Sequence, residues 1–330
     1  MIEAPLLDVR ELSVDFDLGG RWVRALSDVS FEIGRGEILG LVGESGCGKS
    51  LTSLAVMRLL PPNALIAGGR ILLGESDLAA ASEAEMRRLR GDSVAMIFQE
   101  PMVALNPLVS IGHQIEESLI IHRSAGRAAR RERALELLTL VGIPAPAQRH
   151  RQYPHELSGG MRQRAMIAMA LACEPGLIIA DEPTTALDAT IQAQILDLLR
   201  EIRTRLGTSM LFITHNLGVI ADIADRVAVM YAGQVVETAP VDRLFALPAH
   251  PYSAGLLASI PDLRGGRDQR LPSIPGRVPA LGQIPTACPF QDRCPRVTDI
   301  CREQRPPLAL VEPDHRAACW HPLTEVGETP

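Results

Sequence analysis

The chain has 330 residues, of which 46% are hydrophobic, and its formal net charge is −6. The apolar fraction supports a sizeable core, and the length allows one large domain with an accessory region, or two domains. The acidic charge balance lacks the basic footprint of a nucleic-acid-binding protein, so we expect no nucleic-acid partner.

The N-terminus and the apolar segments bear on localisation. The first residues lack the basic region and the apolar run of a signal peptide. No stretch reaches the roughly 18 apolar residues that a membrane-spanning helix needs. We therefore expect a soluble, cytosolic protein that acts at a membrane only through partner subunits.

Strands dominate the expected structure of the first hundred residues, because apolar residues there alternate or form short continuous runs rich in β-branched side chains. One helical segment follows a glycine-rich loop, and the proline pair at 61–62 is expected to end it. The expected strands are 7–16, 23–33, 37–42 and 94–98, and the expected helix is 51–60.

From about residue 100 the apolar spacing becomes helical, with an arginine-rich exposed face, and later strands and helices alternate. Strand, crossover helix and strand in succession predict a largely parallel, covered sheet. Beyond 247 prolines accumulate and periodicity fades, so we expect a separate C-terminal region with little regular structure. The expected helices are 116–121, 128–141 and 191–206, and the expected strands are 177–180, 210–214 and 227–231.

A phosphate-binding loop is predicted at residues 43–50, which read GESGCGKS and match G-x-x-x-x-G-K-[ST]. Glycines let successive backbone N–H groups point at phosphate oxygens, and the following helix adds its N-terminus. Lys49, the only lysine in the chain, would reach the β- and γ-phosphates, and the Ser50 hydroxyl would ligate Mg²⁺. The expected nucleotide-binding residues are Gly43, Glu44, Ser45, Gly46, Cys47, Gly48, Lys49, Ser50 and Leu51.

Two carboxylates, Asp181 and Glu182, follow the predicted buried strand at 177–180. Such a strand end lies beside the phosphate loop at the carboxyl edge of a parallel sheet. Asp181 is therefore expected to hold Mg²⁺, and Glu182 to polarise the attacking water as general base. The loop and these carboxylates together predict a P-loop nucleoside triphosphatase, without saying which kind.

A second anion-binding helix N-terminus is predicted at residues 157–164, which read LSGGMRQR. Because the chain already has one phosphate loop, a second such site suggests action on a nucleotide held by another subunit. The segment resembles the LSGGxxQR signature of ATP-binding-cassette (ABC) transporters. In that family two subunits face head to tail, and each signature closes over the γ-phosphate held by the other. The resemblance implies ATP contacts for Ser158, Gly159, Gly160 and Gln163.

Further positions match this family in order along the chain. Gln99 matches the Q-loop glutamine, which senses Mg²⁺ and the γ-phosphate. Residues 186–188 read ALD and match the D-loop, which implies a nucleotide contact for Asp188, although Thr185 replaces the usual serine. His215 matches the switch histidine that contacts the γ-phosphate. The resemblance thus adds Gln99 and His215 to the catalytic group.

The adenine-stacking aromatic is less clearly assigned. Phe16 matches the position of that aromatic in the family. A core phenylalanine on an early strand would look the same, and Trp22 is a further candidate. The choice between the two stays open.

Three more segments narrow the resemblance to one branch. Residues 99–107 read QEPMVALNP and resemble Q-E-P-x-x-x-L-N-P, and residues 250–257 read HPYSAGLL and resemble H-P-Y-T-x-x-L-L. Residues 287–295 read ACPFQDRCP and resemble C-x-F-x-x-R-C-P. These segments are typical of the ATPase subunits of dipeptide, oligopeptide and nickel importers, in the type called D, and with the cassette motifs they cover nearly the whole chain.

Four cysteines cluster near the C-terminus, and in a reducing cytosol such thiols bind metal more often than they form disulfides. Their spacing is not the paired C-x-x-C of zinc ribbons, and four thiolates suit either Zn²⁺ or an iron–sulfur cluster. Some members of the resembled family carry a [4Fe–4S] cluster here, so the resemblance favours that over Zn²⁺ or reduced thiols. A structural role is expected, since a metal would hold a proline-rich tail folded. The cysteines are Cys288, Cys294, Cys301 and Cys319.

The resemblance implies an α/β fold with a P-loop, RecA-like core. To this core it adds an N-terminal antiparallel β subdomain, an inserted α-helical subdomain at about 100–165 and an irregular C-terminal extension. The ABC ATPase domain is expected to span residues 1–246, and the extension with the four-cysteine site residues 247–330.

The expected function is ATP binding and hydrolysis in an ABC importer of dipeptides or oligopeptides. Import of nickel or another small solute is an alternative, as is a non-transport ABC ATPase acting on DNA or ribosomes. The implied partners are a second ABC ATPase subunit, two transmembrane permeases and a periplasmic or extracellular solute-binding protein. The family suggests a heterodimer with an F-type subunit, peripheral at the cytoplasmic face of the inner (plasma) membrane. The solute and the choice between homodimer and heterodimer stay open.

Overall fold

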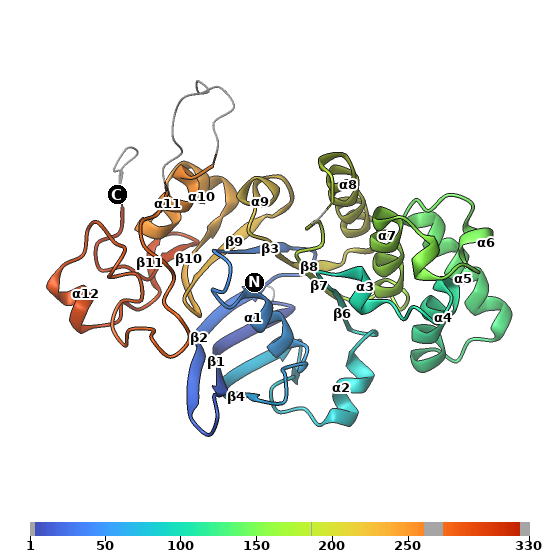
Figure 1. The fold of residues 1–330 in the computed structure, drawn as a ribbon, viewed down its shortest axis with the longest axis horizontal. Helices are drawn as coiled ribbons and strands as arrows, with labels where there is room; N and C mark the ends of the chain where they lie inside the picture. The colour runs from blue at the N-terminus through green and yellow to red at the C-terminus, as the bar shows by residue number, and fades with distance from the viewer. Residues whose placement is uncertain (1–3, 186, 261–272, 324–330) are drawn as a thin grey trace. The chain divides into compact units, whose positions relative to one another are not determined.

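The computed structural model describes residues 4–185, 187–260 and 273–323 (Figure 1). The chain forms two compact units, each drawn from several segments. Unit 1 consists of Met1–Leu6, Ile33–Glu37 and Ala80–Ile213. Unit 2 consists of Leu7–Glu32, Ile38–Ala79 and Thr214–Pro330.

Unit 1 contains three parallel strands, in which β7 pairs with β6 on one side and with β8 on the other. All three strands are buried throughout, as expected for continuous apolar runs in a parallel sheet. Helix α8 connects β7 to β8, which confirms the predicted strand–helix–strand order. The elements are α2 (Glu83–Leu89), β6 (Val94–Ile97), α3 (Pro101–Ala104), α4 (Ile111–His122), α5 (Arg127–Leu140), α6 (Pro146–Arg149), a 3₁₀ turn (Pro154–Glu156), α7 (Gly159–Ala170), β7 (Leu177–Asp181), α8 (Ala189–Leu206) and β8 (Ser209–Ile213).

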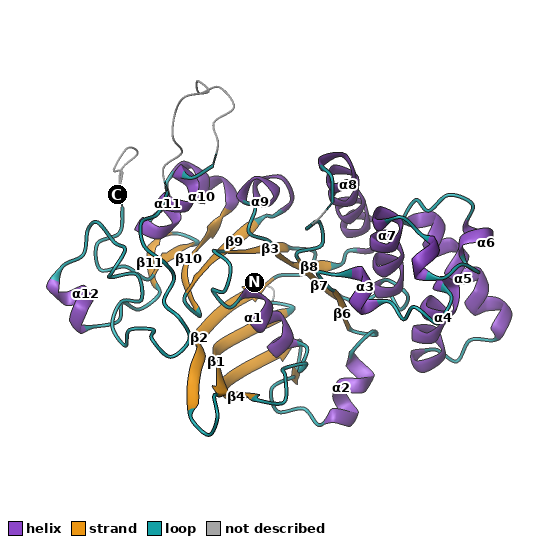
Figure 2. Cartoon of the chain, in the orientation of Figure 1, coloured by secondary structure: helices purple, strands orange, loops and turns teal. Residues whose placement is uncertain are grey.

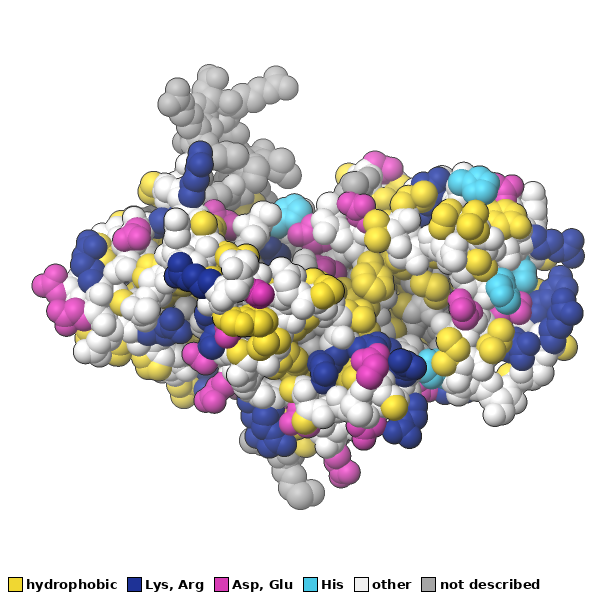
Figure 3. All heavy atoms as spheres, turned by 60° about the horizontal axis from the view of Figure 1, so that its bottom comes forward, with side chains coloured by type: hydrophobic (Ala, Val, Ile, Leu, Met, Phe, Trp, Pro, Cys, Tyr) yellow, Lys and Arg dark blue, Asp and Glu magenta, His cyan; other side chains and the backbone are white. Residues whose placement is uncertain are grey.

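The helices between β6 and β7 form a separate group, visible in purple in Figure 2. Helices α4, α5 and α7 pack against one another through apolar side chains that include Leu119 and Leu138. The predicted helices at 116–121 and 128–141 are confirmed as parts of α4 and α5. Figure 3 shows dark-blue basic side chains gathered at the edge of the unit that carries α5 and α6. Arg127 and Arg131 on α5 are exposed, so the predicted arginine-rich face is also present.

Unit 2 contains two sheet portions. One is a four-stranded sheet with the order β2-β1-β4-β5, in which β1 and β4 are antiparallel. The other runs in the order β11-β12-β10-β9-β3, with β3 and β9 parallel and the remaining pairs antiparallel. The elements are β1 (Leu7–Asp17), β2 (Trp22–Ile33), β3 (Ile38–Val42), α1 (Lys49–Val56), β4 (Ala64–Leu73), β5 (Ser76–Asp77), α9 (Leu217–Ile223), β9 (Arg226–Tyr231), β10 (Gln234–Pro240), α10 (Val241–Ala246), α11 (Pro251–Ala258), α12 (Asp299–Glu303), β11 (Ala309–Glu312) and β12 (His315–Ala317).

Helix α1 differs from its predicted span of 51–60 at both ends. It begins at Lys49, directly after Gly48 in a left-handed conformation, and ends at Val56. The proline pair does not end it. The chain turns at Arg58, which has φ 54°, and the Arg58 guanidinium donates to the carbonyl oxygens of Leu78 and Ala79 at 2.9 and 2.8 Å. A local backbone turn, in which the N–H of Leu59 donates to the carbonyl oxygen of Leu54 at 2.8 Å, thus ends the helix, and contacts with a distant segment accompany it.

The C-terminal region has more regular structure than expected. Strand β12 pairs with β10 through Glu237–Ala317 and Thr238–Arg316, so the region adds strands to a sheet instead of lying apart from it. Figure 2 shows that loops nevertheless dominate around α12. The prediction of little regular structure missed this pairing, because strands of three or four residues leave no periodic pattern in the sequence.

A buried carboxylate strengthens this attachment. Glu237 on β10 accepts hydrogen bonds from the backbone N–H groups of Ala249 and His250 at 2.6 and 2.9 Å. Its Oε1 also lies 2.7 Å from Nε2 of His315 on β12. Such a buried acid is stable only when it is well hydrogen-bonded, so Glu237 ties β10 to both α11 and β12.

In the part of the chain that the structure describes, no helix combines the length and apolarity needed to cross a bilayer.

Candidate nucleotide site

The predicted phosphate loop lies in unit 2, between β3 and α1. Gly43 has φ 153°, and a Cβ added there would lie 2.2 Å from the carbonyl oxygen of Met230. Gly48, with φ 107°, precedes the helix. Ser45 and Gly46 are exposed at the crest of the loop. The glycines thus allow the loop to curl and to pack closely against its neighbours. The crest of the loop stays open to a ligand.

A Gly43→Ala substitution tests this packing. We expect it to lower the free energy of unfolding by more than about 3 kcal/mol, because the new methyl group meets a backbone oxygen that cannot move aside. Gly46→Ala is the matched control, since Gly46 also has a left-handed φ of 79° but nothing lies within 4 Å of its added Cβ. Chemical denaturation of both variants gives the comparison. Equal losses of stability in the two variants would mean that the backbone conformation, and not the Met230 contact, makes glycine necessary at position 43.

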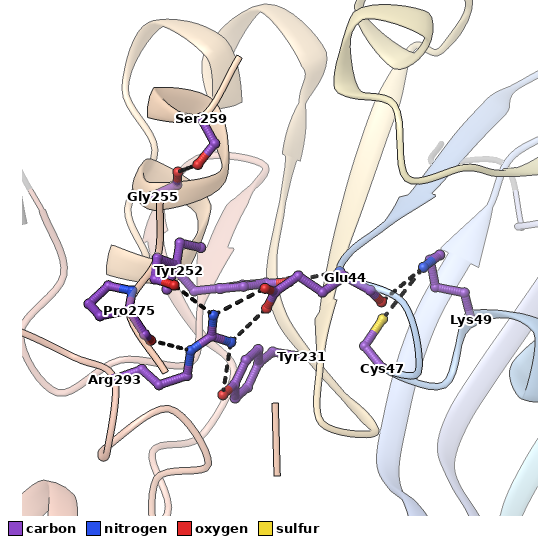
Figure 4. A network of polar contacts seen from close by, with 10 residues as sticks. Glu44, Cys47, Lys49, Tyr231, Tyr252, Gly255, Ser259, Pro275 and Arg293 are labelled. Atoms are coloured by element: carbon purple, nitrogen blue, oxygen red, sulfur yellow. Dashed lines mark hydrogen bonds and ion pairs between the residues drawn. The ribbon is translucent and has the colours of Figure 1, made fainter. Parts of the chain in front are cut away.

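Lys49 is buried at the start of α1, with its ammonium group inside the loop. Its Nζ donates to the carbonyl oxygens of Gly43 and Glu44 at 2.8 and 3.1 Å and lies 3.8 Å from Sγ of Cys47 (Figure 4). Burial raises the pKa of Cys47, so its side chain is a neutral thiol. Cys47 is thus a small, neutral residue that fits within the loop.

The remaining predicted residues of unit 2 are accessible. Phe16 is half-buried near the end of β1, opposite Ala64, whereas Trp22 opens β2 and is 51% exposed. His215 is exposed in the turn before α9. The choice of the adenine-stacking aromatic and the role of His215 stay predictions.

Unit 1 places two hydrogen-bond donors at the carboxylate of Glu182. Asp181 is the buried last residue of β7, and Glu182 follows it with φ 47°. The side-chain amide of Gln99 donates to Oε2 of Glu182 at 3.2 Å, and the hydroxyl of Thr185 donates to the same oxygen at 2.9 Å. A positive φ in a residue other than glycine costs about 1–3 kcal/mol and is typical of functional sites. The predicted general base therefore has a strained backbone and a carboxylate oriented by two donors.

The signature segment begins helix α7. The Ser158 hydroxyl caps this helix by accepting a hydrogen bond from the N–H of Met161 at 3.3 Å. Ser158 and Gly159 are exposed, as binding to an outside phosphate requires, and Gly160 is half-buried. Gln163 is only 2% exposed, and its Nε2 has no hydrogen-bond partner among the described residues. Direct contact of Gln163 with a nucleotide stays a prediction.

Asp188 has a structural role that the sequence analysis missed. Its Oδ1 accepts a hydrogen bond from the N–H of Ile191 at 3.0 Å and caps helix α8. The signal was present in the sequence, since an aspartate directly before an apolar-periodic segment is typical of an N-cap. Its D-loop neighbour Ala186 lies outside the described residues.

The four clustered cysteines line one small pocket in unit 2, together with His250, Phe290 and His321. None of the chain's six cysteines forms a disulfide. Burial raises the pKa of Cys294, and it raises the pKa values of Cys288 and Cys319 to about 11 and 12. Without a positive partner these groups are therefore neutral thiols at physiological pH.

The residues that line this pocket bear on the predicted metal group. Four converging sulfur donors are a suitable ligand set for a thiolate-bound metal. However, within the described ranges no group of three or more Cys, His, Asp or Glu side chains is placed to hold a metal ion. A single Zn²⁺ with bonds of about 2.3 Å needs its sulfurs almost in contact, whereas an iron–sulfur cluster carries its four ligands on separate irons. Whether the cysteines hold a [4Fe–4S] cluster, Zn²⁺ or no metal therefore stays a prediction.

Two residues without a predicted role contact the phosphate loop. The Tyr252 hydroxyl accepts a hydrogen bond from the N–H of Glu44 at 2.9 Å, and Arg293 forms an ion pair with the Glu44 carboxylate at 2.6 Å. Both residues belong to segments singled out as typical of the importer branch, at 250–257 and 287–295. Both segments were recognisable in the sequence, but their contact with the phosphate loop was not predicted.

Comparisons with known proteins agree with these features. The family model for the ABC transporter matches residues 26–185, and the model for the oligopeptide/dipeptide transporter C-terminal region matches residues 236–301. A probable peptide ABC transporter ATP-binding protein of Sinorhizobium fredii is 54% identical over 316 residues, covering 96% of this chain and 94% of the relative. The oligopeptide transport ATP-binding protein of Bacillus subtilis is 50% identical over 328 residues, covering 98% and 92%.

A comparison with solved structures also indicates an ATP-binding cassette. The dimeric post-hydrolysis state of an ATP-binding cassette bound to ADP and Pi has a TM-score of 0.64 and 28% identity, covering 71% of this chain and 98% of that one. The predicted fold class, an α/β P-loop ATPase with an antiparallel β subdomain, is thereby confirmed. The chain belongs to the family of ABC transporter ATP-binding proteins, in the branch that carries the oligopeptide/dipeptide transporter C-terminal region.

Proposed function

We propose that the chain is the ATP-hydrolysing subunit of an importer of dipeptides or oligopeptides. The main support for hydrolysis comes from Glu182. This residue follows a buried strand and has a strained backbone, and its carboxylate accepts hydrogen bonds from Gln99 and Thr185. Relatives named as peptide transport proteins over nearly the whole chain support the choice of solute.

In this proposal each predicted residue has the role that the family pattern gives it. Lys49 and the backbone N–H groups of the phosphate loop bind the phosphates. Mg²⁺, held by Ser50, Asp181 and Gln99, would neutralise charge on the transferred phosphoryl group. Glu182 accepts the proton of the attacking water, and His215 contacts the γ-phosphate.

The proposed assembly has a second ATPase subunit whose signature segment completes the site. The exposed Ser158–Gly159 end of α7 supports this, because the start of this helix is open to a ligand. By the family pattern the second subunit is of F type, and two permeases connect the pair to a solute-binding protein. The chain would then lie peripherally at the cytoplasmic face of the inner membrane. Binding of ATP favours the closed pair, and hydrolysis reopens it.

Transport by the reconstituted complex tests the proposal. The chain is co-purified with its cognate permeases and second ATPase subunit, placed in vesicles with the solute-binding protein, and supplied with labelled peptides or Ni²⁺. We expect ATP-dependent uptake of peptide that a complex with Lys49→Ala lacks. Uptake of Ni²⁺ without peptide would favour the nickel alternative. Failure to associate with permeases, with binding to DNA or ribosomes instead, would contradict a role in transport.

We further propose that Cys288, Cys294, Cys301 and Cys319 hold a [4Fe–4S] cluster. Their convergence on one pocket supports this, and a cluster would offset the unfavourable burial of thiolates there. Its role would be to hold the loops around α12 folded.

Metal analysis of protein purified without oxygen tests the cluster. We expect about four iron and four sulfide ions per chain, lost in Cys301→Ser. Cys173→Ser is the matched control, because Cys173 is equally buried but lies on the other unit. Zinc without iron would support the single-ion alternative, and neither metal would leave four reduced thiols.

A further inference from the structure

Glu44 in the phosphate loop is held at three points (Figure 4). Its backbone N–H donates to the hydroxyl of Tyr252 at 2.9 Å, and its carbonyl oxygen accepts from Nζ of Lys49 at 3.1 Å. Its carboxylate accepts two hydrogen bonds from Arg293, at 2.6 Å from Nη1 and 3.0 Å from Nη2. Two of the three points belong to the C-terminal extension.

Arg293 itself has little freedom to move. The side chain is 4% exposed, and its Nε donates to the carbonyl oxygen of Pro275 at 2.8 Å. The guanidinium carbon lies 5.6 Å from the ring centroid of Tyr231 and 6.0 Å from that of Phe290. A buried guanidinium with two parallel bonds to a carboxylate is among the stronger and more directional polar contacts in proteins. Arg293 therefore fixes where the Glu44 side chain lies.

An aromatic cluster supports the same contact. The rings of Tyr231 and Tyr252 have centroids 4.6 Å apart, and Phe290 lies 5.2 Å from the first and 5.5 Å from the second. Tyr231 ends β9, and two residues later the N–H of Gly233 donates to the carbonyl oxygen of Cys47 at 2.9 Å. Rigid packing thus extends from the loop at 288–294 to the phosphate loop.

Attachment of the extension does not require this contact. The extension is already joined to β10 by the β12 ladder and by Glu237, and Arg243 on α10 forms an ion pair with Glu312 on β11. Arg293 differs because its partner is a phosphate-loop residue, 249 positions away. Removal of Arg293 would leave the Glu44 carboxylate in the phosphate loop without its cationic partner, and removal of Glu44 would leave the buried Arg293 guanidinium without its carboxylate partner.

We propose that Arg293 is a positioning residue for the phosphate loop, and that it couples nucleotide affinity to the order of the loop at 288–294. This inference rests on the proposed function, since it assumes that the phosphate loop binds ATP. The loop at 288–294 also carries Cys288 and Cys294, so whatever orders the cysteine pocket favours ATP binding. Because thermodynamic coupling is reciprocal, ATP binding in turn stabilises the ordered loop at 288–294, by the same free energy by which the ordered loop favours ATP binding.

Nucleotide affinity of the full chain tests the coupling. Arg293→Met is expected to raise the Kd and the KM for ATP about 5- to 30-fold and to leave kcat largely unchanged. This size corresponds to the coupling energies that are usual for two residues in direct contact. Arg293→Lys should restore part of the affinity, and the Arg293→Met/Glu44→Gln double variant should bind no more weakly than Arg293→Met. Arg243→Met is the matched control, because it breaks an ion pair of the extension that does not reach the phosphate loop.

Hydrogen exchange of the wild-type chain gives a second readout that is independent of the variants' folding. ATP is expected to slow exchange of the backbone amides at 288–294 several-fold. Unchanged exchange there, or equal ATP affinity of Arg293→Met and wild type, would overturn the coupling while leaving the ATPase function intact. Absence of ATP binding by the wild-type chain would instead contradict the proposed function.

Discussion

Replacement of Lys49 by alanine is expected to reduce ATP hydrolysis by at least about 100-fold, because it removes the one ammonium group of the phosphate loop. The loop loses a second function of this side chain as well. Nζ bridges the carbonyl oxygens of Gly43 and Glu44, so its removal also loosens the curl that presents the N–H groups. Steady-state ATPase assays and nucleotide titration measure both effects.

Lys49→Arg is the informative companion variant. The charge is kept, but a planar guanidinium does not fit the buried space between two carbonyl oxygens, so we expect little recovery. Because the chain has no other lysine, an amine-acylating reagent modifies only this side chain and the N-terminus. ATP should slow acylation at Lys49 and not at the N-terminus. Near-normal hydrolysis by Lys49→Ala would contradict the assignment of Lys49 to the nucleotide site.

The Glu182→Gln variant is expected to bind ATP normally but to hydrolyse it about 10²- to 10⁴-fold more slowly, since the amide cannot accept a proton from water. Glutamine has the same shape and still offers an oxygen to Gln99 and Thr185, so the strained turn should survive. Blocked hydrolysis should trap the ATP-bound closed pair of subunits. Turnover assays and light scattering with ATP measure these two results.

Glu174→Gln provides the control for this variant. Glu174 has a similar left-handed backbone, with φ 54°, but its carboxylate pairs with Arg133 at an exposed position. Hydrolysis by Glu174→Gln should match the wild type. Full activity of Glu182→Gln would show that another group activates the water.

The parts of the site that the sequence predicted are those defined by neighbouring residues. The phosphate loop, the carboxylates after β7 and the signature helix each depend on residues within about eight positions of one another. Local backbone geometry determines such motifs, and their order along the chain identified the family. Strands β3, β7 and β9 were predictable for the same reason, as continuous apolar runs.

The features that the sequence did not predict depend on contacts between distant residues. The pairing of Glu44 with Arg293 spans 249 positions, and neither residue alone indicates its partner. The contact of Arg58, just after α1, with Leu78 and Ala79 also joins segments that are separated in the sequence. The burial of Gln163 was also unforeseen, because the signature pattern does not indicate which of its side chains face inward.

The pairing of β12 with β10 has a consequence for shortened forms of the protein. A chain ending near residue 246 would lack β11 and β12, which leaves the backbone donors and acceptors along one side of β10 without partners. The Glu237 carboxylate would lose Ala249, His250 and His315 at once. Open strand edges recruit strands from other molecules, so such a fragment would tend to self-associate into insoluble aggregates.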